Sequence, residues 1–327
     1  MQQPNQKVTD ELVERLWPTM PSVSKIANHL NATSRVVAKR VAALRARGVP
    51  LSSPDVRSPF YNKSDWPQIR REIVHYDARV NVTIPSGIIL VGSDAHFWPG
   101  ERTTAFRGFL RFISELKPRI VVLNGDVFDG ARISRFARIG WDKTPTVIDE
   151  LKAVKERLVE IEDLCGSAAK FWPLGNHDAR FETKLAQMAP EYEGVGGFHL
   201  KDHFPTWKPC WSVMVNERVL ITHRWKGGKY AAPNNTLQAG VSMVTGHLHS
   251  LKWWPHTDEI GTRYGVDSGT LAEPTGQQFI NYTEDSPKDW RSGFCVLTIH
   301  KGQLLQPELV KVHAEGEIDF RGTVVTV

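Results

Sequence analysis

Cysteine is scarce in this sequence of 327 residues, since Cys165, Cys210 and Cys295 are odd in number, widely spaced and form no CxxC pair. They supply neither a disulfide framework nor a thiolate metal site, and they suit a reducing cytosol. No run approaches 18 consecutive apolar residues, so we expect no membrane span. The first ten residues, MQQPNQKVTD, have no apolar core, so we expect no signal peptide and a cytoplasmic protein, as in a bacterial or phage-infected cell.

Excess acidic charge is also absent, because the formal net charge is +5. The basic excess lies at the N-terminal end. Residues 1–79 hold 13 Lys and Arg against 7 Asp and Glu, whereas the remaining 248 residues hold 28 against 29. This asymmetry favours a polyanion-binding module attached to a near-neutral body, although an ordinary solvated basic face would give the same count.

Three short helices are predicted between residues 9 and 48. The first runs from Thr9 to Trp17, and apolar residues then recur at helical spacing on two further segments. A break at residues 31–33 separates these segments, and Gly48 ends the last one. Three short helices with a three-residue turn resemble a helix-turn-helix domain.

The last of these helices carries basic side chains on its expected solvent face. A recognition helix uses such side chains to contact phosphates and base edges. The predicted DNA-binding residues are Arg35, Lys39, Arg40, Arg45 and Arg47. The same helices could instead serve protein contacts or dimerisation, so this interpretation stays open beside DNA binding.

The chain is expected to divide into a helix-turn-helix-like DNA-binding domain (1–50), a linker with a short helix (51–85) and an α/β domain (86–327). In the last part, apolar runs at 87–94, 118–126 and 169–178 alternate with helical patterns at 103–117 and 145–164. Further strands follow, including a hairpin around residues 216–217. Alternating strands and helices predict an α/β fold with two packed mixed β-sheets flanked by helices.

Five apolar runs of this α/β domain end in Asp, Asn or His. The segments are DAH (94–96), GDVFD (125–129), GNHD (175–178), His223 and GHLH (246–249). Ligands in open α/β sheets lie beyond the carboxyl ends of strands, and these residue types bind divalent first-row metals. On an extended segment, DAH and HLH would each place two side chains on one face. Each motif alone could be a solvated turn, but five of the twelve histidines lie at these positions.

The motifs D-x-H, G-D-x-x-D, G-N-H-D, a later histidine and G-H-x-H, in this order, resemble the calcineurin-like metallophosphoesterase superfamily over roughly residues 86–270. The resemblance implies a two-metal phosphoesterase domain in residues 86–327. It implies that one metal is held by Asp94, His96 and His249, that the other is held by Asn176, His223 and His247, and that Asp126 bridges them. It also assigns a catalytic role to His177, an orienting role to Asp178 and a supporting hydrogen bond to Asp129.

The chemistry of such a ligand set agrees with this resemblance. Two divalent ions about 3.5–4 Å apart clamp the attacking and leaving oxygens of a phosphoryl displacement, and they lower the pKa of a bridging water towards about 7. The oxygen and imidazole ligands admit Mn, Fe, Zn, Ni, Co or Mg, and Mn²⁺ is favoured for a nuclease.

A phosphoesterase joined to a DNA-binding module predicts a metal-dependent phosphodiesterase that is a DNA nuclease or nickase and uses a metal-bridging hydroxide. One alternative is a phosphatase or phosphodiesterase for small nucleotides or phosphoproteins, with the helices used for protein contacts. Another is a DNA-binding regulator with an inactive phosphoesterase domain, against which the intact ligand set argues. Several aromatic residues follow the motifs and could stack on bases or pack loops, namely Phe97, Trp98, Trp225, Trp253 and Trp254.

Overall fold

The computed structural model describes residues 8–51, 76–136, 141, 143–280 and 288–327. The chain divides into two compact units, 1–75 and 76–327, each with its own hydrophobic core. The short helix expected within the linker falls in residues 52–75, outside the described residues. Within the described ranges, no helix combines the length and the apolar character that crossing a membrane requires.

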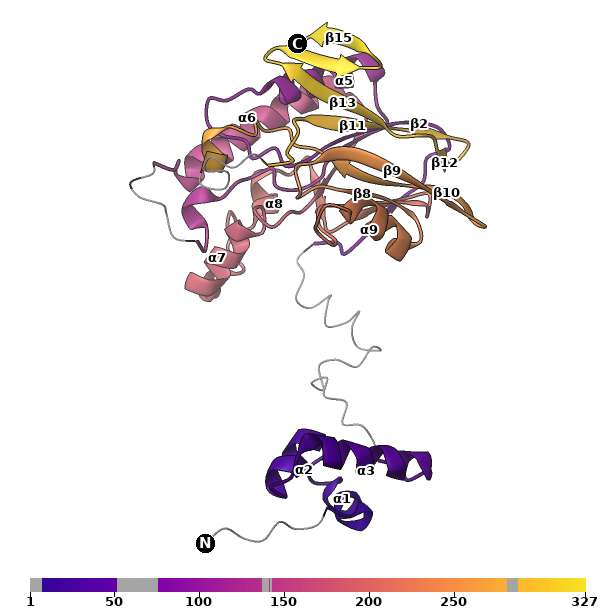
Figure 1. The fold of residues 1–327 in the computed structure, drawn as a ribbon. Coiled ribbons are helices and arrows are strands. Elements are labelled where there is room, and N and C mark those ends of the chain that lie inside the picture. The colour runs from indigo at the N-terminus through magenta and orange to yellow at the C-terminus, as the bar shows by residue number, and fades with distance from the viewer. Residues whose placement is uncertain (1–7, 52–75, 137–140, 142, 281–287) are drawn as a thin grey trace. The chain divides into compact units, whose positions relative to one another are not determined.

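The N-terminal unit contains three helices, as predicted: α1 (Asp10–Leu16), α2 (Val23–His29) and α3 (Ser34–Ala46) (Figure 1). The side chains of Thr9 and Ser22 cap α1 and α2 by accepting backbone N–H groups of their first turns. The helices share one apolar core, which includes Val13, Ile26, Ala27, Val37, Val41 and Leu44. The three-helix arrangement is confirmed, whereas its use as a helix-turn-helix stays a prediction.

The second unit is built on two mixed sheets. In the described part of the chain, one sheet has six strands in the order β1-β6-β7-β8-β10-β9. These strands are β1 (Val80–Val82), β6 (Val213–Val215), β7 (Val219–Thr222), β8 (Ser242–Thr245), β10 (Gly261–Ser268) and β9 (Leu251–Asp258).

The other sheet has nine strands in the order β15-β14-β13-β11-β2-β3-β4-β5, with β12 paired to β11. These strands are β15 (Thr323–Thr326), β14 (Glu317–Phe320), β13 (Glu308–Ala314), β11 (Gly293–His300), β2 (Gly87–Gly92), β3 (Ile120–Leu123), β4 (Ala169–Pro173), β5 (Lys208–Cys210) and β12 (Gln303–Leu304).

Helices cover the outer faces of the two sheets (Figure 1). α5 (Thr104–Leu116) packs on the nine-stranded sheet and on α6 (Val147–Cys165), whereas α9 (Ala231–Ala239) packs on the six-stranded sheet. The remaining helices are α7 (Arg180–Met188), α8 (Leu200–His203), η2 (Ala131–Ile133), η3 (Pro190–Tyr192) and η4 (Gln277–Phe279). Side chains of β2 point alternately to the two faces of its sheet, so this strand contributes to both cores. Ile89 and Val91 face the six-stranded sheet, and Leu90 faces the helices. The predicted α/β sandwich of two mixed sheets flanked by helices is confirmed.

Several elements differ from the sequence-based expectation. Strand β1 lies inside the segment 51–85 that was expected to be linker, and it pairs in parallel with β6. Strand β9 was not predicted, although it contains Trp253 and Trp254. The predicted hairpin is present, since β6 and β7 are antiparallel and Asn216 and Glu217 adopt positive φ angles of 51° and 57°.

Candidate metal centre

The predicted metal-binding residues converge at the carboxyl ends of five strands. β2, β3 and β4 are parallel neighbours in one sheet, and β7 and β8 are parallel neighbours in the other. The residues after these strands are therefore delivered to the same edge of the sandwich. Among the described residues, three groups place their potential ligand atoms within 4.8 Å of one another; one joins His96 with Asp129 and His177, and the other two are clusters of predicted ligands. These clusters are Asp94, His96 and His249, and Asp126, His223 and His247.

The backbone of these segments is left-handed rather than extended. The φ angles are +51° at Asp94, +39° at His96, +50° at Asp126, +71° at His247 and +53° at His249. Strand alternation was therefore the wrong explanation for the spacing of DAH and HLH. The strands end at Gly92 and Thr245, and the turns that follow aim both side chains of each pair inward. Such φ values are costly for residues with a Cβ and cluster at functional sites.

Two glycines beside the ligands are required by close contacts. A Cβ on Gly125, where φ is +82°, would lie 2.3 Å from Nδ1 of His223. A Cβ on Gly175 would lie 2.0 Å from Oδ1 of Asp126. The glycines of the GDVFD and GNHD motifs therefore leave room for the ligand side chains of neighbouring segments.

The buried histidines are held in the tautomer that suits metal binding. Nδ1 of His96 lies 2.8 Å from Oδ1 of Asp129, and Nδ1 of His223 lies 2.7 Å from the carbonyl oxygen of Asn124. An N–H at Nδ1 leaves the Nε2 lone pair of each ring for a metal ion. Nε2 of His96 and Oδ1 of Asn176 are buried and have no hydrogen-bond partner among the described residues, and Nε2 of His223 is buried beside the carboxylate of Asp126. Orphaned buried acceptors of this kind fit a metal centre.

The carboxylate of Asp126 lies between His223 of its own cluster and His96 of the other cluster. Its Oδ2 is 3.1 Å from Nε2 of His223 and 4.0 Å from Nε2 of His96. Its Oδ1 accepts the backbone N–H of His177 at 2.8 Å, which holds the carboxylate in this position. Asp126 therefore lies close to residues of both clusters, and its bridging role stays a prediction.

The charges of this centre shift the pKa values of its members. Burial alone would raise the pKa of Asp126, but the imidazoles of His223 and His177 outweigh it and hold this pKa well below its usual range. Burial would lower the pKa of His223, but the carboxylates of Asp126 and Asp94 raise it to about 9. Burial lowers the pKa of His96 and keeps its ring neutral, as a metal ligand requires.

The structure corrects the predicted role of Asp178. Oδ1 of Asp129 lies 2.9 Å from Nδ1 of the His177 ring, and Oδ2 of Asp126 lies 4.0 Å from its Nε2. Asp178 instead accepts five N–H groups at 2.8–3.0 Å, because the loops after β3 and β4 wrap around it. These donors are the backbone N–H groups of Asp126, Val127, Phe128 and Gly175 and the indole of Trp172. Asp178 therefore positions the two ligand-bearing loops rather than His177.

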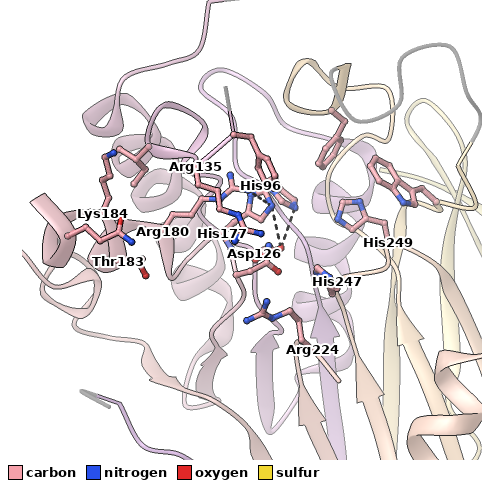
Figure 2. Close-up of a pocket in the computed structure, with 16 residues that line it drawn as sticks. His96, Asp126, Arg135, His177, Arg180, Thr183, Lys184, Arg224, His247 and His249 are labelled. Atoms are coloured by element: carbon pink, nitrogen blue, oxygen red, sulfur yellow. Dashed lines mark hydrogen bonds and ion pairs between the residues drawn. The ribbon is translucent and has the colours of Figure 1, made fainter. Parts of the chain in front are cut away.

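The metal-binding clusters open into a cleft of about 890 Å³ (Figure 2). Cationic side chains line it on and near α7, where Figure 2 shows Arg180 and Lys184, and Arg135 and Arg224 also line it. Aromatic side chains line it near His249, where the ring centroids of His249 and Trp290 are 4.4 Å apart and Phe279 contacts both rings.

The aromatic residues that the sequence suggested lie elsewhere. Phe97 is buried in the helix-facing core, and Trp253 packs against Tyr264 in the six-stranded sheet. Trp254 and Trp225 are exposed, but neither they nor Trp98 are among the described residues that line the cleft. Packing is therefore the correct interpretation for Phe97 and Trp253.

Three residues near the site escaped the sequence analysis. Arg180 donates to Nε2 of His177 at 3.0 Å and lies two residues after the GNHD motif, which is the signal that could have found it. Glu150, fully buried at the start of α6, accepts the backbone N–H groups of Gly130 and Ala131 and so anchors the loop that carries Asp129. Trp290 is remote in sequence from every motif.

The predicted DNA-binding residues of α3 are all exposed, and three of them also contact α1 or the residue that follows it. Arg40 and Arg47 form ion pairs with Asp10 of α1, at 3.4 and 2.5 Å. The guanidinium of Arg45 lies 5.7 Å from the ring centroid of Trp17. Arg35 and Lys39 are exposed. The expected solvent exposure of these side chains is therefore confirmed, whereas their use in DNA binding stays a prediction, and Asp10 of α1 offsets part of the positive charge of Arg40 and Arg47.

An α/β sandwich with clustered histidines and aspartates beyond its strand ends defines a metal-dependent phosphoester hydrolase. A family model described as calcineurin-like phosphoesterase matches residues 88–267, more than half of the chain, and the chain belongs to this family. The family and the two clusters point to a site for a pair of divalent metal ions.

Several solved structures are similar to this chain at low sequence identity. Zinc-bound Vps29 from Entamoeba histolytica is 12% identical with a TM-score of 0.36, covering 73% of this chain and 98% of that one. An archaeal phosphodiesterase is 13% identical with a TM-score of 0.35, covering 68% and 99%. The E. coli phosphoesterase YfcE is 16% identical with a TM-score of 0.32, covering 67% and 97%. No curated protein sequence matches the chain.

Proposed function

We propose that this phosphoester hydrolase is a phosphodiesterase acting on nucleic acid, as a DNA nuclease or nickase. The observation that carries the proposal is the charge of the cleft. Four cations, Arg135, Arg180, Lys184 and Arg224, line it together with the histidine clusters, and Asp126 supplies the only carboxylate among its described lining residues. A polyanionic substrate fits such a surface better than an isolated monoester does.

Asp94, His96 and His249 would hold one ion, and Asn176, His223 and His247 the other, with Asp126 shared. When bound, two divalent ions would activate water and neutralise the charge of the reacting phosphate. We favour Mn²⁺, since the ligands are oxygen and imidazole donors without thiolate.

His177 would assist the departure of the leaving oxygen. Burial lowers the pKa of His177, but the carboxylates of Asp126 and Asp129 outweigh it and raise this pKa, which favours a ring able to donate a proton. Asp129 orients the ring through Nδ1, so Nε2 is the donor atom. Arg180 donates to Nε2 in this structure, and we propose that its guanidinium moves to a phosphate oxygen when substrate enters.

The N-terminal unit would bring the enzyme to DNA. Its support is the basic excess of residues 1–79 and the exposure of Arg35 and Lys39 on α3. If the N-terminal unit serves protein contacts instead, deleting it would leave the affinity of the enzyme for DNA unchanged.

The test compares substrates with the same metal-loaded protein. Supercoiled plasmid, linear DNA, bis-p-nitrophenyl phosphate and p-nitrophenyl phosphate are incubated with Mn²⁺, and products are quantified. We expect cleavage of DNA and of the diester. Hydrolysis confined to the monoester would overturn the proposal. Deleting residues 1–50 is expected to reduce plasmid cleavage more than diester hydrolysis, and equal effects on both would exclude targeting by this unit.

A further inference from the structure

Helix α7 has two chemically different faces. Phe181 is buried in the helix-facing core, and Leu185 packs against that core. On the same side of the helix, Glu182 accepts the backbone N–H of Leu200 at 2.9 Å. These contacts fix α7 to the body of the unit, so that its other face is held rigidly towards the cleft.

The cleft face of α7 carries no acidic residue. Arg180, Thr183, Lys184 and Gln187 all line the cleft, at the spacing i, i+3, i+4 and i+7 that forms one stripe along a helix. Figure 2 shows Arg180, Thr183 and Lys184 projecting from α7 on the side of His177 that lies away from His249. α7 also contacts η2, and the exposed Arg135, two residues after η2, adds a further cation to the same wall.

The two ends of the cleft therefore differ in chemistry. Near His249 the described wall is aromatic, formed by Phe279 and Trp290. Towards α7 it carries cations and neutral hydrogen-bonding side chains, together with Ile133 and Phe136 beside Arg135. The helical segment from Arg180 to Gln187 extends over about 10 Å, at about 1.5 Å per residue. That length corresponds to the axial rise of roughly three nucleotides of a helical strand, at about 3.4 Å each.

We propose that this α7 face, with Arg135, is a binding subsite for the phosphodiester groups that flank the scissile phosphate, so that one strand of a polynucleotide leaves the metal centre along α7. The inference rests on the proposed function and goes beyond it, because it assigns a direction and a minimum length to the substrate. Lys184 and Arg135 contact phosphate there, while Thr183 and Gln187 donate hydrogen bonds to it.

The experiment measures kcat/KM on a dinucleotide, a tetranucleotide and an octanucleotide of thymidine, using the full chain with Mn²⁺. The wild type is expected to prefer the longer substrates. In the double variant Arg135→Ala/Lys184→Ala, the preference for the octanucleotide over the dinucleotide is expected to fall roughly tenfold, since each exposed ion pair with a phosphate contributes modestly. The dependence of log KM on log salt should flatten by about 0.7 for each phosphate that the variant no longer neutralises.

A matched pair of charge reversals separates the subsite from the general charge of the protein. Lys184→Glu should reduce the preference for the octanucleotide further than Lys184→Ala does, whereas Lys155→Glu on the exposed face of α6 should leave it unchanged. A wild type that cleaves all three oligonucleotides equally well, or variants with an unaltered length preference, would overturn the subsite and leave the nuclease function standing. Failure of the wild type to cleave the oligonucleotides, the plasmid and the linear DNA while it hydrolyses bis-p-nitrophenyl phosphate would overturn both.

Discussion

Oδ1 of Asp129 lies 2.9 Å from Nδ1 of His177, and the same oxygen lies 2.8 Å from Nδ1 of His96. One carboxylate therefore orients both a metal-binding imidazole and the imidazole proposed to act on the leaving group. Burial would raise the pKa of Asp129, but its contacts with the two histidines lower it, so the carboxylate stays ionised.

Asp129→Ala is expected to weaken metal binding and turnover together. Loss of a carboxylate that orients a metal-ligating histidine typically reduces metal affinity or activity about 10- to 100-fold. Metal titration followed by diester hydrolysis at saturating metal measures the two effects separately. Wild-type affinity and turnover in this variant would show that the shared hydrogen bonds have no functional role.

His177→Ala is expected to lower kcat by roughly 10²–10⁴-fold, the usual contribution of a positioned proton donor. Both metal ions should remain bound, because His177 is not among the proposed ligands. Elemental analysis of the purified variant gives the metal content. A matching loss of metal would mean that His177 is itself a ligand.

The ligand assignment predicts different metal contents for three variants. His249→Ala and His247→Ala should each lower the bound metal from two ions towards about one. Asp126→Ala should lose both ions, because a bridging carboxylate coordinates each of them. Equilibrium dialysis followed by elemental analysis checks this. Equal losses in all three variants would contradict the assignment.

Asp178→Ala is expected to destabilise the fold. Removing the carboxylate leaves five buried N–H groups without their acceptor, and an unsatisfied buried donor costs about 1–3 kcal/mol. Urea unfolding of the protein after its metal has been removed with a chelator should show that the free energy of unfolding falls by at least about 3 kcal/mol. Asp163→Ala, on the exposed side of α6, is the control and should change stability little. A loss of activity at unchanged stability would restore a direct role for Asp178 in the reaction.

Glu150 should make stability depend on pH. Burial and the nearby charge of Asp129 raise the pKa of Glu150 to about 8, from a usual value of 4.5. Between these two values the carboxyl group of Glu150 is protonated in the folded protein but ionised in the unfolded chain. The protonated group therefore stabilises the fold fully below about pH 4.5, and this stabilisation is lost as the pH rises through about 8. The free energy of unfolding of the chelated protein should fall in this window by up to about 1.4 kcal/mol per pH unit. Glu150→Gln should flatten that slope, and an unchanged slope would refute the assignment.

Much of the fold and the convergence of the candidate ligands could be predicted, since both depend on local pattern. The alternation of apolar runs and helical stripes indicates strands β2, β3, β4, β7 and β8, and the residues directly after each strand must lie at a sheet edge. The helices of the N-terminal unit follow from periodicity and caps in the same way. Strand β9 escaped prediction because its exposed and half-buried residues, such as Trp253 and Trp254, show no clean alternation.

The sequence by itself determined which residue types stand at the strand ends, because the covalent order of a strand and the residue after it survives any packing. The tertiary structure alone decided which neighbours those residues meet. Asp129 and Asp178 are similar carboxylates in adjacent motifs, yet one contacts two imidazoles and the other five N–H groups, because loops distant in the chain close around them differently. Trp290 reaches the cleft while Trp254 does not, and Asp10 pairs with two arginines some thirty residues away. Hydrogen bonds and ring contacts act only over a few ångströms, so they follow distance in space rather than distance along the chain.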